Sequence, residues 1–206
     1  MNGLYINLDE QKDREKYVNG LKNKYDFFKN IIREPAVKKN LGYYGCTLSH
    51  INCLEKLKTS TDKYVMVMED DLTIRDPDNF KLFISDFENI KDSDIWDIIV
   101  MTPRGETVCD VSYNFKKIIK NQTTTCYIIK TKFIPRVLEC FYESKSRIEN
   151  GVRQGLAAID VAWKPLQLES NFLYYSKLFA SQVAQYSSIE KRYMNYHSIF
   201  MDQYNR

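Results

Sequence analysis

One stretch of the chain combines a continuous apolar run with a cluster of acids. The apolar residues are Tyr64-Val65-Met66-Val67-Met68, and they lead directly into Glu69-Asp70-Asp71. Such a short run, rich in aromatic and β-branched residues, is typical of a strand buried on both faces, as in a parallel sheet. The acids then follow the carboxyl end of the strand, where open α/β sheets bind ligands. Because side chains alternate along an extended chain, Glu69 and Asp71 should project to one side and Asp70 to the other.

Strands and helices are predicted to alternate along the rest of the chain. Apolar residues that recur every three or four positions predict helices from Thr47, from Pro77 and around Val137, and a charged run predicts another over 12–24. Predicted strands cover residues 4–8, 31–32, 64–68 and 96–101, with 115–119 and 124–129 as a hairpin or an edge pair. Gly42 and Gly45 predict a loop before the Thr47 helix. This alternation favours a mostly parallel α/β sheet.

Length and composition exclude several classes of protein. The 206 residues suffice for one domain with a sizeable core, so we expect a single domain over 1–206. The 30 basic and 27 acidic side chains are scattered, which gives no sign of nucleic-acid binding or of an anionic membrane surface. The N-terminus has no basic leader, and no apolar run reaches about 18 residues, so we expect a soluble, cytoplasmic chain without a membrane span.

Cysteine usage points to a reducing compartment. The five cysteines are odd in number and form no Cys-x-x-Cys pair, which is typical of small core residues and argues against zinc. Frequent Lys, Asn, Ile and Tyr are typical of an AT-rich genome, such as that of a virus or a bacterium.

The acidic triplet is the first candidate for chemistry. Two unit charges about 4 Å apart repel by roughly 4 kcal/mol at an effective dielectric constant near 20, so three adjacent carboxylates favour a cation. Mg²⁺ and Mn²⁺ prefer oxygen ligands, often one or two carboxylates plus substrate phosphates. The alternative is a solvated acidic turn that binds nothing.

Three short motifs in register carry a family resemblance. They are Tyr5-Ile6-Asn7-Leu8-Asp9 with Arg14, Gly45-Cys46-Thr47-Leu48-Ser49-His50, and Met68-Glu69-Asp70-Asp71. Together they resemble glycosyltransferase family 25, which includes lipopolysaccharide and collagen galactosyltransferases. The resemblance covers the first half of the chain and extends loosely to Ala158-Ile159-Asp160 and to residues 182–189. It implies a GT-A (Rossmann-like) fold with a mostly parallel mixed sheet flanked by helices, a nucleotide-sugar donor, a divalent metal and inversion at the anomeric carbon.

The resemblance also implies roles for single residues at the metal and the reacting atoms. Asp71 would contact Mn²⁺ or Mg²⁺ directly, Glu69 would face the ribose or the water shell of the metal, and His197 would complete the metal site. Glu69 departs from a literal Asp-x-Asp motif, although glutamate is usual there in this family. Asp160 is the candidate base for the acceptor hydroxyl. A surface aspartate and a surface histidine are the alternatives for Asp160 and His197.

Further residues are candidates for binding the UDP-sugar donor. They are Asn7, Arg14, Ser49, His50, Asp70, Gln182 and Ser187, the last two by resemblance alone. Asn7 and Arg14 would contact the base or the diphosphate. Ser49 and His50 are expected near a helix start, where unpaired N–H groups favour phosphate. A solvated helix cation, an ordinary first-turn serine and a packed histidine are the alternatives for Arg14, Ser49 and His50.

The last third of the chain is the candidate for the acceptor side. Its aromatic residues are Trp163, Phe172, Tyr174, Tyr175, Phe179 and Tyr186. Aromatic planes pack on the C–H faces of sugars, so we expect a glycan pocket beside Asp160 with Trp163 or Tyr186 partly exposed. Burial of these rings in the core is the alternative.

These observations predict a metal-dependent inverting glycosyltransferase. It would move a hexose from a UDP-sugar to a hydroxyl of a glycan or of a protein-linked acceptor. The alternative is a non-catalytic module of the same fold that binds a nucleotide-sugar or a partner. A phosphoryl-transfer receiver domain fits less well, because no lone acid follows the next buried strand and no Gly-rich phosphate loop is present.

Overall fold

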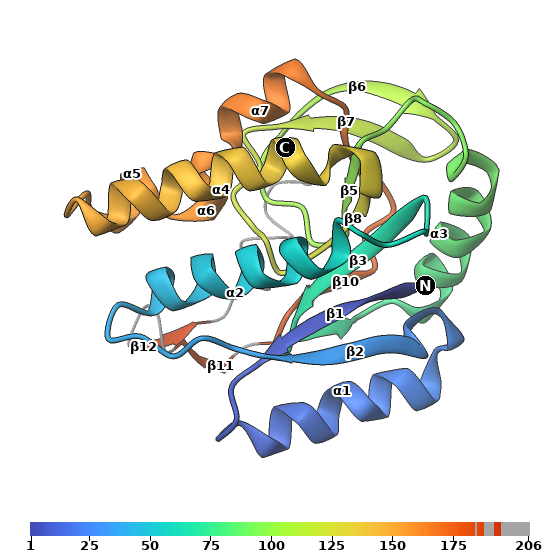
Figure 1. Cartoon of the computed structure of the whole chain (residues 1–206). Coiled ribbons are helices and arrows are strands. Elements are labelled where there is room, and N and C mark those ends of the chain that lie inside the picture. The colour runs from blue at the N-terminus through green and yellow to red at the C-terminus, as the bar shows by residue number, and fades with distance from the viewer. Residues whose placement is uncertain (184, 188–191, 195–206) are drawn as a thin grey trace.

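A mixed sheet of eight strands forms the centre of the computed structural model, which describes residues 1–183, 185–187 and 192–194, with side chains through Val183 (Figure 1). The strand order is β2-β1-β3-β8-β5-β9-β7-β6. The strands are β1 (Asn2–Asn7), β2 (Asn30–Pro35), β3 (Tyr64–Glu69), β5 (Ile98–Val100), β6 (Glu106–Ser112), β7 (Phe115–Ile119), β8 (Cys126–Lys130) and β9 (Phe172–Tyr175).

Strand directions place several chain segments at one edge of the sheet. Strand β1 is parallel to β2 and β3, and β5 is parallel to β9. Strand β8 lies between β3 and β5 and is antiparallel to both. The carboxyl ends of β1, β3 and β5 therefore meet the amino end of β8 at the same edge. Glu69 is the last residue of β3 at this edge, and Asp70 and Asp71 follow it, so the acids lie at the carboxyl end of the strand as the sequence predicts.

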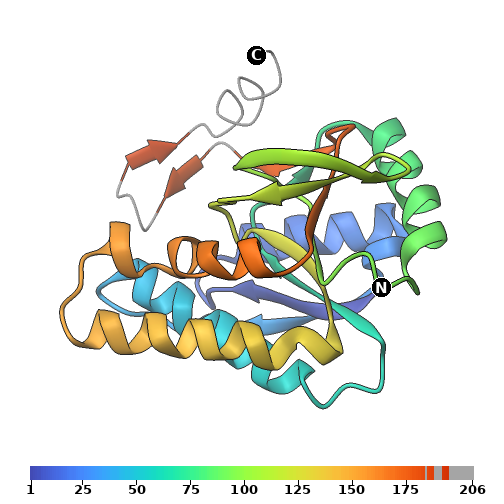
Figure 2. The same ribbon diagram turned by 90° about the horizontal axis from the view of Figure 1, so that it is seen from above.

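Helices cover both faces of the sheet (Figures 1 and 2). They are α1 (Lys12–Lys24), α2 (Gly42–Leu57), α3 (Pro77–Ile90), α4 (Ile134–Glu149), α5 (Gln154–Ala157), α6 (Ile159–Ala162) and α7 (Lys164–Glu169). Helices α1 and α3 bury Val18, Leu21 and Phe83 in one hydrophobic cluster. Helices α2 and α4 bury Leu54 and Phe141 in the other. The sequence-predicted α/β sheet flanked by helices is confirmed.

Two local predictions are wrong. Helix α2 begins at Gly42, so Gly42 and Gly45 lie in its first turn and not in a loop. Gly45 is required there because an added Cβ would lie 2.4 Å from the Val37 carbonyl oxygen. The segments 115–119 and 124–129 do not pair with each other. Strand β7 pairs with β6 and β9, whereas β8 is buried along its whole length and pairs with β3 and β5.

A short ribbon brings the later part of the chain back to the acidic triplet. Strand β4 (Leu72–Ile74) pairs antiparallel with β10 (Ala180–Gln182), so that Gln182 lies opposite Leu72. The remaining described strands, β11 (Gln185–Ser187) and β12 (Arg192–Met194), pair with each other. Within the described ranges, no helix combines the length and the apolar character needed to cross a bilayer.

Candidate active site at the carboxyl edge of β3

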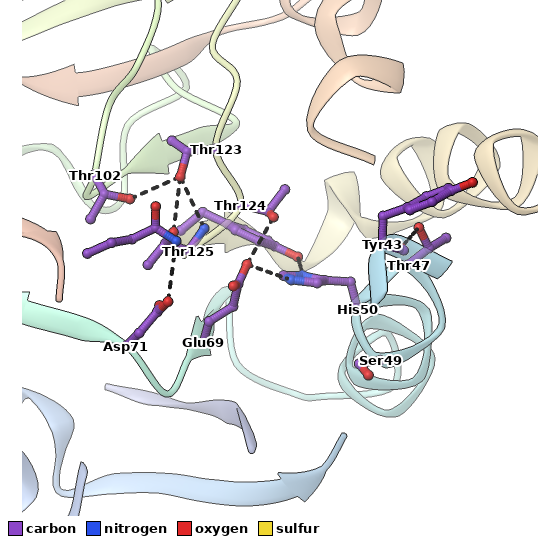
Figure 3. Close-up of polar contacts among 12 residues, drawn as sticks. Tyr43, Thr47, Ser49, His50, Glu69, Asp71, Thr102, Thr123, Thr124 and Thr125 are labelled. Atoms are coloured by element: carbon purple, nitrogen blue, oxygen red, sulfur yellow. Dashed lines mark hydrogen bonds and ion pairs between the residues drawn. The ribbon is translucent and has the colours of Figure 1, made fainter. Parts of the chain in front are cut away.

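Glu69 lies between helix α2 and the segment that precedes β8 (Figure 3). Its Oε1 accepts a hydrogen bond from the Thr124 hydroxyl at 3.1 Å and lies 3.3 Å from His50 Nε2. Its backbone N–H donates to the Thr125 carbonyl at 2.7 Å, which continues the β3–β8 pairing. The Glu69 side chain is 21% exposed, so its carboxylate is fixed by the protein yet reachable by a ligand.

Asp70 points into a different polar network. Its carboxylate accepts hydrogen bonds from Asn7 Nδ2 at 2.7 Å and from the Arg14 guanidinium at 3.0 Å. Arg33 in turn donates to Asn7 Oδ1 at 2.8 Å. Burial raises the pKa of Asp70, and Arg14 and Asn7 oppose this rise. The predicted divergence of Glu69 and Asp70 is confirmed, whereas donor binding by Asn7, Arg14 and Asp70 stays a prediction.

Asp71 lies beside the β4–β10 ribbon. Gln182 Nε2 donates to Asp71 Oδ2 at 3.4 Å, and the Val183 N–H donates to the Asp71 carbonyl at 2.8 Å. In Figure 3, Asp71 and Glu69 both point toward the segment that carries threonines 123–125. The structure therefore brings Gln182 to the triplet. The side chain of Ser187 and the whole of His197 lie outside the described residues.

Asp160 lies in the short helix α6 and within the field of the same carboxylates. Its pKa is raised, first by burial and further by the charge of Glu69, while Lys164 and Arg104 act in the opposite direction. A carboxyl group whose pKa is raised in this way is better suited to accept a proton than a solvated one. Glu69 and Asp160, which lie far apart in the sequence, are thus near enough in the fold for the charge of one to act on the other.

The predicted positions of Ser49 and His50 at a helix N-terminus are wrong. Because α2 begins at Gly42, both residues lie about 10 Å along the helix from its start. The Ser49 hydroxyl donates to the Gly45 carbonyl and accepts from the Val37 N–H, both at 2.8 Å. His50 is fully buried and reaches the site through Glu69. Ser49 fixes the chain before α2, and His50 contacts the acidic triplet directly.

The predicted aromatic acceptor pocket is wrong for every ring that the structure describes. Trp163 and Phe172 are 0% exposed, and Tyr174, Tyr175 and Phe179 are also buried. Trp163 packs against Tyr127, Phe141 and Phe172, and its indole N–H donates to the Asn121 carbonyl. These rings belong to the two hydrophobic clusters on the faces of the sheet, where burial of their apolar surface stabilises the fold. The side chain of Tyr186 lies outside the described residues.

Four residues at this edge were not among the predicted site residues. They are Cys46, Thr124, Tyr127 and Lys164. Thr124 binds Glu69, and the Tyr127 hydroxyl lies 3.1 Å from His50 Nδ1. The sequence indicates that Thr124 lies just before a buried strand. Only the antiparallel direction of β8 relative to β3 shows that this position lies next to Glu69. Cys46 was expected in the core and is only partly buried, and Cys109 is exposed.

The residues of this edge fit a hard divalent cation. Glu69 and Asp71 offer carboxylate oxygens, and Gln182 offers an amide oxygen beside Asp71. Mn²⁺ and Mg²⁺ prefer oxygen ligands of this kind. Burial raises the pKa of the Cys46 thiol, and the charges of Glu69, Asp160 and Asp71 raise it further.

Known proteins resemble the chain in sequence profile and in fold. A glycosyltransferase involved in the glycosylation of the major capsid of PBCV-1 has a similar structure, with a TM-score of 0.50 and 10% identity over 91% of this chain and 94% of that chain. A197 from STIV has a TM-score of 0.49 and 12% identity over 96% of both chains. No sequence of a curated protein is significantly similar. At an identity of 10%, the similarity to the PBCV-1 glycosyltransferase shows the fold alone, and this fold is of the GT-A class.

The sequence profile that matches gives the family. It is the profile of "Glycosyltransferase family 25 (LPS biosynthesis protein)", and it matches residues 6–152, which include the acidic triplet and most of the residues around it. With this match and a GT-A fold, the chain belongs to glycosyltransferase family 25 and is a sugar-transferring enzyme.

Proposed function

We propose that this enzyme is a metal-dependent, inverting glycosyltransferase that moves a hexose from a UDP-sugar to a hydroxyl of a glycan or a protein-linked acceptor. One observation carries the proposal. Carboxylates from two remote segments lie within reach of each other's charge: Glu69 ends β3, Asp71 follows it, and Asp160 lies in α6, where burial and then the charge of Glu69 raise its pKa. Direct displacement needs one such base near the donor and no protein nucleophile.

The donor is proposed to bind at the acidic triplet. Asp71 and Glu69 would hold Mn²⁺ or Mg²⁺, with Gln182 holding the Asp71 carboxylate in place. When bound, a divalent cation neutralises the charge that develops on the departing diphosphate. Thr124 donates a hydrogen bond to the Glu69 carboxylate, and His50 Nε2 lies 3.3 Å from the same oxygen. Asn7, Arg14 and Asp70 form one network next to the triplet and are proposed to position the nucleotide end of the donor.

Asp160 is proposed to act on the acceptor. Its carboxylate accepts the proton of the acceptor hydroxyl while that oxygen forms a bond to the anomeric carbon. The bond from the anomeric carbon to the diphosphate oxygen breaks in the same step, which inverts the configuration. Burial and the charge of Glu69 raise the pKa of Asp160, and this makes it a stronger base than a solvated aspartate.

Calorimetry of UDP binding in the presence of Mn²⁺ tests the donor site. The wild type should bind UDP only with the metal, and Asp71→Asn should lose this binding while keeping its circular dichroism spectrum. Asp110→Asn is the matched control, because Asp110 is an exposed carboxylate in β6. An unchanged, Mn²⁺-dependent UDP affinity in Asp71→Asn would contradict the assignment of Asp71.

A panel of nucleotide-sugars, incubated with Mn²⁺ and followed by mass spectrometry, tests the donor class. Release of UDP from a UDP-hexose, faster than from other donors, is the expected result. Magnetic resonance of the product should show the anomeric configuration opposite to that of the donor. Retained configuration would contradict a single displacement with Asp160 as base.

A further inference from the structure

A thiol, an imidazole and a carboxylate meet next to the proposed donor site. Cys46 Sγ, a ring nitrogen of His50 and a carboxylate oxygen of Glu69 all lie within 4.8 Å of one another. Cys46 and His50 are four positions apart in α2 and therefore lie on the same face of the helix. The glycosyl transfer proposed above makes no use of the thiol, so this cluster calls for a separate explanation.

The hydrogen bonds of His50 suit a metal ligand. Its Nε2 faces Glu69 at 3.3 Å, and its Nδ1 lies 3.1 Å from the Tyr127 hydroxyl. When Nδ1–H donates a hydrogen bond to this hydroxyl, Nε2 carries the lone pair and can bind a metal ion on the side of Glu69. Metal-binding histidines usually donate their second N–H in this manner, because the bond fixes both the tautomer and the ring orientation.

Charge and access also favour a cation at this cluster. A thiolate, a carboxylate and a neutral imidazole around a divalent ion give no net charge. Glu69 is 21% exposed, so an ion can approach the cluster from the side of Glu69.

We propose that Cys46, His50 and Glu69 form a binding site for a thiophilic divalent metal ion of the Zn²⁺ class. A thiolate and an imidazole select Zn²⁺ over Mg²⁺ or Mn²⁺ because they are softer ligands than oxygen. A tetrahedral zinc ion holds its ligand atoms roughly 3.5 Å apart, so the three side chains need to close by only about 1 Å. The His50–Glu69 distance of 3.3 Å already fits.

Because Glu69 is shared, zinc binding should compete with donor binding, and this part of the inference rests on the proposed function. Glu69 cannot coordinate a zinc ion and the metal of the donor site in the same geometry. Bound Zn²⁺ therefore weakens Mn²⁺-dependent UDP binding and inhibits transfer, and removal of Zn²⁺ by a zinc-selective chelator in the presence of excess Mn²⁺ restores both.

Titration with Co²⁺ alone tests the site without any nucleotide. Cobalt bound to the thiolate should give a charge-transfer absorption in the near ultraviolet, with one ion per chain. Cys46→Ser should lose this absorption, and Cys109→Ser should retain it because Cys109 is exposed and lies outside the cluster. No thiolate absorption in the folded wild type overturns the proposal, as does absorption that survives Cys46→Ser and disappears in Cys109→Ser.

Two more variants keep the test decisive if Cys46→Ser does not fold. Tyr127→Phe removes only the hydroxyl and should weaken Zn²⁺ binding by about 10- to 100-fold while the cobalt absorption persists. Glu69→Gln should weaken it as well, whereas Asp71→Asn should leave the cobalt absorption in place although it abolishes UDP binding. Equal Zn²⁺ affinity in wild type, Tyr127→Phe and Glu69→Gln overturns the proposal. Loss of UDP binding in Asp71→Asn with intact cobalt binding shows that the donor site and the zinc site can be tested independently of each other.

Discussion

Replacing Arg14 with glutamine should destabilise the fold through Asp70. Arg14 donates to the Asp70 carboxylate at 3.0 Å, and the two side chains are 24% and 9% exposed. Breaking a buried ion pair by removing one partner costs about 3–5 kcal/mol. Water reaches the Arg14 side, and Asn7 Nδ2 still donates to Asp70 at 2.7 Å, so a smaller loss follows. We expect the free energy of unfolding to fall by about 1–3 kcal/mol at neutral pH.

The loss should depend on pH with a definite sign. Burial already raises the pKa of Asp70, and removal of Arg14 takes away the largest opposing influence and raises it further. A raised pKa in the folded state favours folding at low pH, and this contribution is lost as pH rises through the folded-state pKa. The difference between the variant and the wild type should therefore be largest at neutral pH and shrink as Asp70 becomes protonated.

Urea unfolding followed by fluorescence of the buried residues Trp96 and Trp163 measures this loss. Lys12→Gln is the matched control, because Lys12 lies in the same helix and is 71% exposed. It should change the free energy of unfolding by no more than about 0.5 kcal/mol. If Arg14→Gln unfolds at the same urea concentration as Lys12→Gln, the buried pair does not stabilise the fold. If the decrease in unfolding free energy of Arg14→Gln does not vary with pH, the ionisation of Asp70 is not its cause.

Three further changes separate chemistry from packing. Asp160→Asn should lower the rate of transfer by a factor of about 10² to 10⁴ with UDP affinity nearly unchanged, as measured by product formation and calorimetry; near-normal transfer would place the base elsewhere. Because the pKa of Asp160 is raised, wild-type transfer should increase with pH through a midpoint above the ordinary aspartate value of about 3.9, and this step should be absent in the variant. Trp163→Ala should cost about 3–5 kcal/mol of unfolding free energy, since the ring is 0% exposed; a stable variant with impaired acceptor binding would restore the sugar-binding role. Ser49→Ala should cost about 1–3 kcal/mol in urea unfolding, because the Val37 N–H loses its acceptor; an unchanged midpoint would show that water replaces the hydroxyl.

Local patterns in the sequence predicted the elements that are defined by contacts along the chain. The apolar run before Glu69 forms β3, the charged run over 12–24 forms α1, and the periodic segments from Pro77 and around Val137 form α3 and α4. The divergence of Glu69 and Asp70 follows from the alternation of side chains in an extended strand, which holds in any fold. The start of α2 was missed because Gly42 and Gly45 are typical of loops, and only the contact with Val37 explains a glycine inside the helix.

Which side chains meet at the site depends on contacts between residues that lie far apart in the sequence. His50 meets Tyr127 over 77 positions, and Glu69 meets Thr124 over 55, because β8 inserts between β3 and β5 in the opposite direction. The same strand also brings Tyr127 into contact with the Trp163 ring. Periodicity shows that a segment has an apolar face but not which other segment covers it, since burial is nondirectional and any apolar partner lowers the free energy. The sequence alone therefore determined the acidic strand end, and the tertiary structure decided which side chains surround it.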